Sequence, residues 1–271
     1  MTLLLLLLLA CGPGGDITRG QRALDAGDLA TAERAFRSAV DADPTSVDAL
    51  YGLGWTWHLA GDGAAARGAF EKLVVLGPAS PLGYKGLGSV ALSEGNLPEA
   101  RTRFGAALER SPGDLAILHS LALVELSAKD GPAALAALDA LVAREPDRAE
   151  FHQARAEALL LLDRGDDAVD AATIAVAKGG TLRVQVLARL TRARALLVAS
   201  AHRVDPAACA ETAPPVYAWM DEADRMLDEA VALQPSFAEL VTARRAVSRR
   251  RGAVDDACPG HRVSGKGFPG G

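Results

Sequence analysis

Residues 47–78 read VDALYGLGWTWHLAGDGAAARGAFEKLVVLGP, and residues 81–112 read PLGYKGLGSVALSEGNLPEARTRFGAALERSP. The two stretches carry the same residue types at matching places, 34 residues apart. The matched pairs are Gly54 and Gly88, Ala66 and Ala100, Phe70 and Phe104, and Pro78 and Pro112. Repetition at a fixed period of this length is typical of an array of stacked structural units.

The same period continues on both sides of these stretches. Prolines recur at Pro44, Pro78, Pro112 and Pro146, and alanines at Ala32, Ala66, Ala100, Ala134 and Ala168. We therefore expect units at 13–46, 47–80, 81–114 and 115–148, and a weaker one at 149–182. Ala and Leu dominate the chain, whereas aromatic residues make up only 4% of it. This composition favours helices and argues against a β-sandwich or a barrel.

Each recurring position has a mechanical reason. Gly61 can take the left-handed conformation that ends a first helix, and Asp62 can then cap the free N–H groups of a second helix. Gly54 lets that second helix approach closely, and Phe70 fills the space between neighbouring helix pairs. Pro78 ends the second helix. Each unit is therefore predicted to be a pair of helices.

This spacing resembles the tetratricopeptide-repeat (TPR) family, whose pattern is a large apolar residue, Leu-Gly, an aromatic residue, Ala, Phe, Ala and Pro. The unit 47–80 carries the pattern as Leu50, Leu53, Gly54, Trp57, Ala66, Phe70, Leu73 and Pro78. The resemblance extends over about 13–251. It implies an all-α fold, a right-handed α-solenoid of about six TPR helix-turn-helix repeats closed by a C-terminal capping helix.

The domain organisation follows from this register. Residues 11–182 are expected to hold repeats 1–5, and residues 183–251 a divergent sixth repeat with the capping helix. Pro206, Pro214 and Pro215 suggest that a loop is inserted in the sixth repeat. The expected parts are a first helix at 183–199, the loop at about 200–218, a second helix at 219–233, the capping helix at 236–251 and a disordered tail at 252–271.

A run of arginines precedes Gly252 in the expected capping helix. It comprises Arg244, Arg245, Arg249, Arg250 and Arg251. Cations at the end of a helix complement its dipole, which is the favoured interpretation. A patch for a partner or for anionic lipid headgroups is the alternative.

The resemblance also implies a partner-binding groove. In TPR arrays, positions 2, 5, 9 and 12 of each first helix line the concave groove. The candidate groove residues are Asp48, Tyr51, Trp55, His58, Lys85, Ser89, His119, Gln153 and Glu157. Tyr51 and Trp55 are the candidate hot spot, because large aromatic side chains dominate interface energies. The alternative is that Trp55 only packs on a neighbouring unit.

The N-terminus has the features of a targeting segment. Seven leucines and Ala10 precede Cys11, and this run is too short to span a bilayer as a helix. Residues 8–11 resemble a bacterial lipobox, in which the cysteine becomes the lipidated first residue of the mature chain. We therefore expect residues 1–10 to be a lipoprotein signal peptide and Cys11 to be lipidated. Such a protein would lie in the bacterial cell envelope, attached to the membrane, most simply on the periplasmic side of the outer membrane.

Two further cysteines, Cys209 and Cys258, lie far apart in the sequence. An extracytoplasmic compartment permits a disulfide between them, which would hold the tail against the sixth repeat. The alternatives are free thiols, or a metal or redox site built from His202, Cys209, Cys258 and His261.

No nucleophile elbow, paired-histidine zinc motif or complete phosphate-binding loop occurs in the sequence. A net charge of -5 gives no basic footprint for nucleic acid. The sequence thus predicts a protein that is not an enzyme and needs no cofactor, a membrane-anchored scaffold that binds a protein or peptide in its groove. By resemblance to bacterial TPR lipoproteins, its role is the assembly of an envelope complex, as a pilotin or an adaptor of cell-wall enzymes. The metal or redox protein is the alternative.

Overall fold

The computed structural model describes residues 13–201 and 203–259. These residues form thirteen α-helices and one short 3-10 helix, and no strand occurs within these ranges. The expected fold class, an all-helical solenoid of stacked helix pairs, is confirmed. The chain divides into two compact units, residues 1–124 and 125–271.

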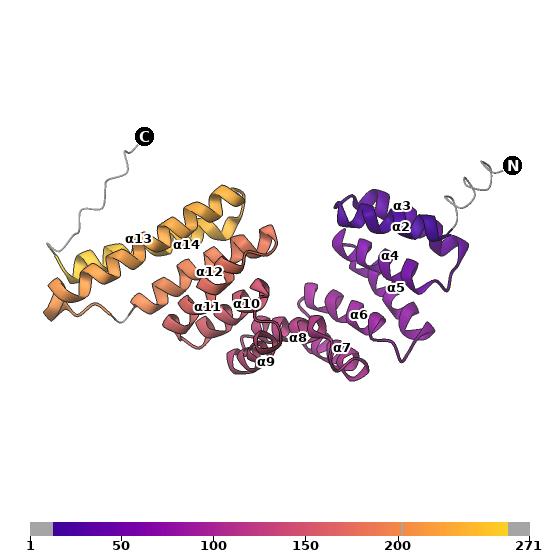
Figure 1. Cartoon of the computed structure of the whole chain (residues 1–271), viewed down its shortest axis with the longest axis horizontal. Coiled ribbons are helices and arrows are strands. Elements are labelled where there is room, and N and C mark those ends of the chain that lie inside the picture. The colour runs from indigo at the N-terminus through magenta and orange to yellow at the C-terminus, as the bar shows by residue number, and fades with distance from the viewer. Residues whose placement is uncertain (1–12, 202, 260–271) are drawn as a thin grey trace. The chain divides into compact units, whose positions relative to one another are not determined.

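Unit 1 is built from pairs of helices (Figure 1). In each pair, α2 packs on α3, α4 on α5 and α6 on α7, while α2 also contacts α4 and α4 contacts α6. The first helices α2, α4 and α6 therefore form one continuous row. The bounds are α2 (Pro13–Asp25), α3 (Leu29–Ala42), α4 (Val47–Leu59), α5 (Gly63–Leu76), α6 (Pro81–Ser93), α7 (Leu97–Arg110) and α8 (Leu115–Ser127), of which the last three residues belong to unit 2.

The turns inside the pairs follow the sequence register. Gly27, Gly61 and Gly95 have positive φ angles of 76°, 84° and 74°, as expected of residues that end a helix in the left-handed conformation. The side chains of the residues that follow them, Asp28, Asp62 and Asn96, each accept a hydrogen bond from a backbone N–H of the next helix.

The close contacts of unit 1 are made between phenylalanine and glycine. A Cβ atom added to Gly54 would lie 2.7 Å from the Phe70 ring, and one added to Gly86 would lie 2.2 Å from it. Phe70 is fully buried, with its ring held between its own repeat and the next. Phe36 has the same arrangement between Gly20 and Gly52. The prediction that Phe70 fills the space between neighbouring helix pairs is confirmed, whereas the glycines of the following unit that meet these rings, Gly52 and Gly86, were not predicted.

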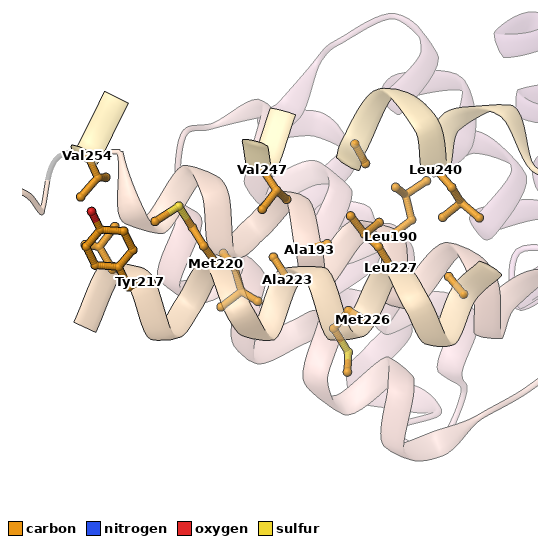
Figure 2. Packing of buried hydrophobic residues seen from close by; sticks show 14 of the residues in the cluster. Leu190, Ala193, Tyr217, Met220, Ala223, Met226, Leu227, Leu240, Val247 and Val254 are labelled. Atoms are coloured by element: carbon orange, nitrogen blue, oxygen red, sulfur yellow. The ribbon is translucent and has the colours of Figure 1, made fainter. Parts of the chain in front are cut away.

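Unit 2 has three longer helices at its C-terminal end. Figure 2 shows the core there, in which Tyr217 of α13 lies beside Val254 of α14. Met220 and Leu227 follow along α13, toward Val247 and Leu240 of α14. The bounds are α9 (Gly131–Arg144), α10 (Ala149–Leu161), α11 (Gly165–Lys178), α12 (Leu182–Ser200), η1 (Pro206–Ala208), α13 (Cys209–Leu233) and α14 (Ala238–Ala257).

The expected loop at about 200–218 is wrong for its second half, because α13 begins at Cys209 and includes Pro214 and Pro215. Each proline removes one N–H from the helical ladder, which is why the sequence suggested a loop. The helix persists because its first turns are packed. Ala213 and Val216 are buried in the core of unit 2, and tertiary packing overrides local propensity.

The tail expected to be disordered from residue 252 is also ordered as far as residue 259. Helix α14 runs through Gly252 to Ala257, and Val254 and Cys258 are buried. The cause is burial of Val254 and Cys258 beyond Gly252. The prediction considered only that glycine disfavours a helix, and not the packing of the residues that follow it. Since the helix continues past the arginine run, the interpretation of these arginines as dipole partners at a helix end is wrong as well. The rest of the tail, 260–271, lies outside the described residues.

Candidate partner-binding surface

The candidate hot spot lies on one face of α4. The rings of Tyr51 and Trp55, one helical turn apart, meet edge to face with their centroids 6.0 Å apart. Both rings also contact the ring of Phe70 edge to face, at 6.2 and 5.8 Å, and His58 lies 5.3 Å from Trp55. Tyr51 and Trp55 are half-buried, so each ring has one side fixed by Phe70 and another side open. Such fixed rings lose little freedom on binding.

The electrostatics of this face follow from its partial burial. Burial raises the pKa of the Tyr51 hydroxyl, and the negative charge of Asp114 adds to that rise. Burial also lowers the pKa of the His58 imidazole, since a charged ring would be poorly solvated beside Trp55. Both effects favour neutral side chains, and the α4 face is thus an apolar aromatic surface with polar atoms at its edge.

The other candidates in unit 1 differ in exposure. Asp48 is exposed at the start of α4, while Lys85, Ser89 and His119 are half-buried. The Ser89 hydroxyl donates to the carbonyl oxygen of Lys85, so its proton is used inside α6. Because α4 and α6 are in contact, Lys85 and Ser89 belong to the row of helices that presents the aromatic pair.

Two candidates, Gln153 and Glu157, lie in unit 2. Gln153 is only 7% exposed, and its amide donates to Glu157 at 2.8 Å and to Thr191 of α12 at 3.5 Å. The expectation that Gln153 faces a partner is therefore wrong, because α12 covers it. Helix α12 is longer than the first helices before it. The rule that assigns groove residues by their position in the repeat takes no account of this difference in length.

Glu157 is a half-buried carboxyl whose environment disfavours its charge. Burial raises its pKa above the ordinary 4.5, and the charge of Arg194 and the hydrogen bond from Gln153 oppose this only in part. The folded state therefore binds the proton more tightly than the unfolded state, and the free energy of unfolding falls as the pH rises from 4.5 through the folded pKa.

We expect Glu157→Gln to stabilise the protein at pH 7, because glutamine keeps the hydrogen bond from Gln153 without placing a charge in this partly desolvated position. The difference in Tm from the wild type should shrink as the pH falls below 4.5. Thermal unfolding at several pH values measures this, with the exposed Glu71→Gln as the control for loss of one charge. A variant that is less stable than the wild type at pH 7 would contradict the role assigned to burial.

The two cysteines of unit 2 come together. The Sγ atoms of Cys209 and Cys258 are 1.97 Å apart with a Cα–Cα distance of 5.5 Å, so the start of α13 is joined to the end of α14 by a disulfide. Both sulfur atoms are consumed by this bond, and no group of three or more His, Cys, Asp or Glu side chains in the described ranges could hold a metal. His202, His261 and the candidate lipidation residue Cys11 lie outside the described residues.

None of the helices described is both long enough and apolar enough to cross a bilayer.

Fold and surface define the class of the protein: a helical-repeat scaffold with a row of first helices that carries an aromatic face. Residues 17–81 and residues 91–158 each match the tetratricopeptide-repeat family, and the chain belongs to that family. TPR repeats generally mediate protein–protein interactions, and the fold is typically a non-catalytic scaffold. Comparison with curated protein sequences gives no match.

Solved structures share the fold at low sequence identity. A chain in the structure of the APC/C hetero-tetramer Cut9-Hcn1 is 19% identical with a TM-score of 0.70, and the match covers 88% of this chain but 43% of that one. The pilF protein of Pseudomonas aeruginosa is 17% identical with a TM-score of 0.65, over 88% of this chain and 96% of that one. YrrB, described as a TPR protein with an unusual peptide-binding site, is 16% identical with a TM-score of 0.52, over 79% and 100%. This chain thus spans less than half of the first relative, and the likeness is one of fold.

Proposed function

We propose that the chain is a membrane-anchored scaffold that binds a protein or peptide partner on the first-helix row of unit 1, with Tyr51 and Trp55 as the main contacts. The partner would present an apolar or aromatic residue to the two rings. Lys85 and Asp48 would set the charge preference at the margins. The role is the assembly of a complex in the bacterial cell envelope, as a pilotin or an adaptor of cell-wall enzymes would perform it.

One observation carries this proposal. Two aromatic side chains stand half-exposed on the same face, at right angles to each other, and a third ring supports them from the core. A core residue of a simple solenoid would be buried more fully, and a solvent-facing residue would seldom be tryptophan. Interface hot spots have this combination of a rigid aromatic ring and a partly desolvated setting.

We expect Trp55→Ala to weaken capture of the partner by more than about 30-fold, the loss that corresponds to a hot spot of about 2 kcal/mol. The measurement is quantitative pull-down from envelope extracts with mass spectrometry, comparing variant with wild type at equal amounts of folded protein. Tyr51→Ala with Trp55→Ala should abolish capture, with helicity by circular dichroism unchanged.

The matched control is Trp57→Ala, which removes the same side chain two residues away. Trp57 donates from Nε1 to Glu33 at 3.0 Å and lies under Arg37, so it holds α4 to α3 and faces away from the aromatic pair. This variant should lose stability and still capture the partner. Equal capture by Trp55→Ala and wild type would sink the assignment of the α4 face.

The anchor is a separate part of the proposal and rests on the sequence around Cys11. We expect Cys11→Ser to move the protein from the membrane fraction to the soluble fraction and to abolish labelling with a palmitate analogue. Fractionation of cells that express the full chain measures both. Continued membrane association of Cys11→Ser, with no lipid label on the wild type, would reject lipidation and leave the α4 face untouched.

A further inference from the structure

The last helix, α14, repeats the register of the first helices. Pro235 stands three residues before the start of α14, as Pro44 does before α4 and Pro78 before α6. Positions 4, 7 and 8 of α4 hold buried residues, Leu50, Leu53 and Gly54. The same positions of α14, with position 11, hold Val241, Arg244, Arg245 and Ser248, and all four are exposed.

In the earlier repeats a second helix covers this face. Phe70 of α5 lies against Gly54, and Phe104 of α7 lies against Gly88. No second helix follows α14 within the described residues, and Val241 is left 56% exposed. A groove of about 610 Å³ occupies this place, which we call the α14 groove. Its apolar lining is Val231, Pro235, Phe237, Leu240 and Val241, and its polar margin is Arg244, Arg245, Ser248 and Arg249.

The arginines of α14 fall into two sets. Three of them serve the fold. Arg250 donates to the carbonyl oxygens of Ser200 and Ala201, while Arg251 pairs with Asp221 and Asp224 and Arg244 pairs with Asp228.

Arg245 and Arg249 are the other set. Both are exposed, both line the α14 groove, and neither forms an ion pair with any residue that the structure describes. An apolar floor beside two cations without counter-charges is complementary to an apolar surface that carries carboxylates.

We propose that the α14 groove binds an amphipathic helix of a partner protein, in the place that the second helix of a seventh repeat would take. Apolar residues of this helix contact Val241 and the groove floor, and its Asp or Glu side chains pair with Arg245 and Arg249. A partner phenylalanine cannot sit as Phe70 does, because position 8 is Arg245 instead of glycine. A carboxylate in that position satisfies the guanidinium. This binding is independent of the α4 face, which lies in unit 1.

The test uses the full chain and two synthetic peptides of 14 residues, the length of α5. One peptide has leucines at spacings of three and four with glutamates beside them, and the other has lysines in place of the glutamates. Fluorescence anisotropy should detect binding of the glutamate peptide and none of the lysine peptide. Arg245→Glu should weaken the glutamate peptide about tenfold, because it removes a charge-assisted contact and adds a repulsion. Arg183→Glu, an exposed arginine at the start of α12, is the matched control and should leave affinity unchanged.

A second variant distinguishes loss of the binding contact from loss of folding. Arg245→Glu with Arg249→Glu should gain affinity for the lysine peptide, which an unfolded protein could not do. Trp55→Ala should bind the glutamate peptide as wild type does, so failure of the proposed function would not affect this result.

Three results would overturn the proposal. The first is equal binding of the two peptides or an equal effect of Arg245→Glu and Arg183→Glu. The second is sedimentation with vesicles of anionic phospholipid that depends on Arg245, without peptide binding, which would assign the groove to a membrane surface. The third is an Arg245-dependent dimer in analytical ultracentrifugation, without peptide binding, which would assign it to a second copy of this chain.

Discussion

Replacing both Cys209 and Cys258 by alanine is expected to lower the free energy of unfolding of unit 2 by about 4 kcal/mol. The two cysteines are separated by 49 residues, and the bond between them restricts the unfolded chain over all of α13 and α14. The loss corresponds to a Tm lower by about 10 °C for a unit of this size. Thermal unfolding in non-reducing buffer measures it, and free-thiol titration of the wild type checks that the bond has formed.

Reduction of the Cys209–Cys258 disulfide in the wild type is the control for the double substitution. Wild type treated with reductant should unfold at about the temperature of the double variant, and the variant itself should not respond to reductant. The part of the protein most affected should be the start of α13, where Pro214 and Pro215 weaken the helix and Cys209 holds it to the end of α14. Hydrogen exchange there should quicken more than in α4. If the wild type has two titratable thiols and reductant leaves its Tm unchanged, this account is wrong.

Gly86→Ala is expected to destabilise unit 1 by about 3 kcal/mol, the upper end of the range for overpacking a core. The added Cβ would lie 2.2 Å from the ring of Phe70, which is itself held against Gly54 on its other side. The ring has no open side into which it can move, so α6 must shift away from α5. Chemical denaturation monitored by circular dichroism measures the change.

The control substitution is expected to change the free energy of unfolding in the opposite direction. Gly68 lies in the middle of α5, and an added Cβ would meet no atom within 4 Å among the described residues. Gly68→Ala should therefore stabilise the protein by about 1 kcal/mol, since alanine is the better helix former. Destabilisation by both variants, or by neither, would show that contact with Phe70 does not limit the packing.

The fold could be predicted wherever the 34-residue register is intact. Gly61, Asp62 and Pro78 each act on the backbone close to their own position, and so their effects can be read without knowledge of the tertiary structure. The prediction failed at Pro214, Pro215 and Gly252, which act against a helix locally but lie in a core that stabilises one. Burial of Ala213 and Val216 reverses the local preference at the prolines, and burial of Val254 and Cys258 reverses it beyond Gly252.

The candidate surface was predictable to a smaller extent. Position in the repeat placed Tyr51 and Trp55 on one face of α4, as observed, but could not indicate that Phe70 fixes both rings. For Gln153 the same rule failed, because the helix that covers it, α12, departs from the repeat in length. Contacts between units of a repeat depend on both sequences at once, and one unit read alone does not contain them.

The pairing of Phe36 and Phe70 with a glycine of the following repeat has a consequence for how such a chain can change in length. If residues 47–80 were removed, Phe36 would face Gly86 where it now faces Gly52, and the junction would be built from equivalent residues. Deletion of one residue fewer or one residue more would bring Lys85 or Leu87 into that space, and each of these side chains has a Cβ. A chain of this kind can therefore gain or lose a whole repeat and keep the same phenylalanine–glycine contact at the new junction.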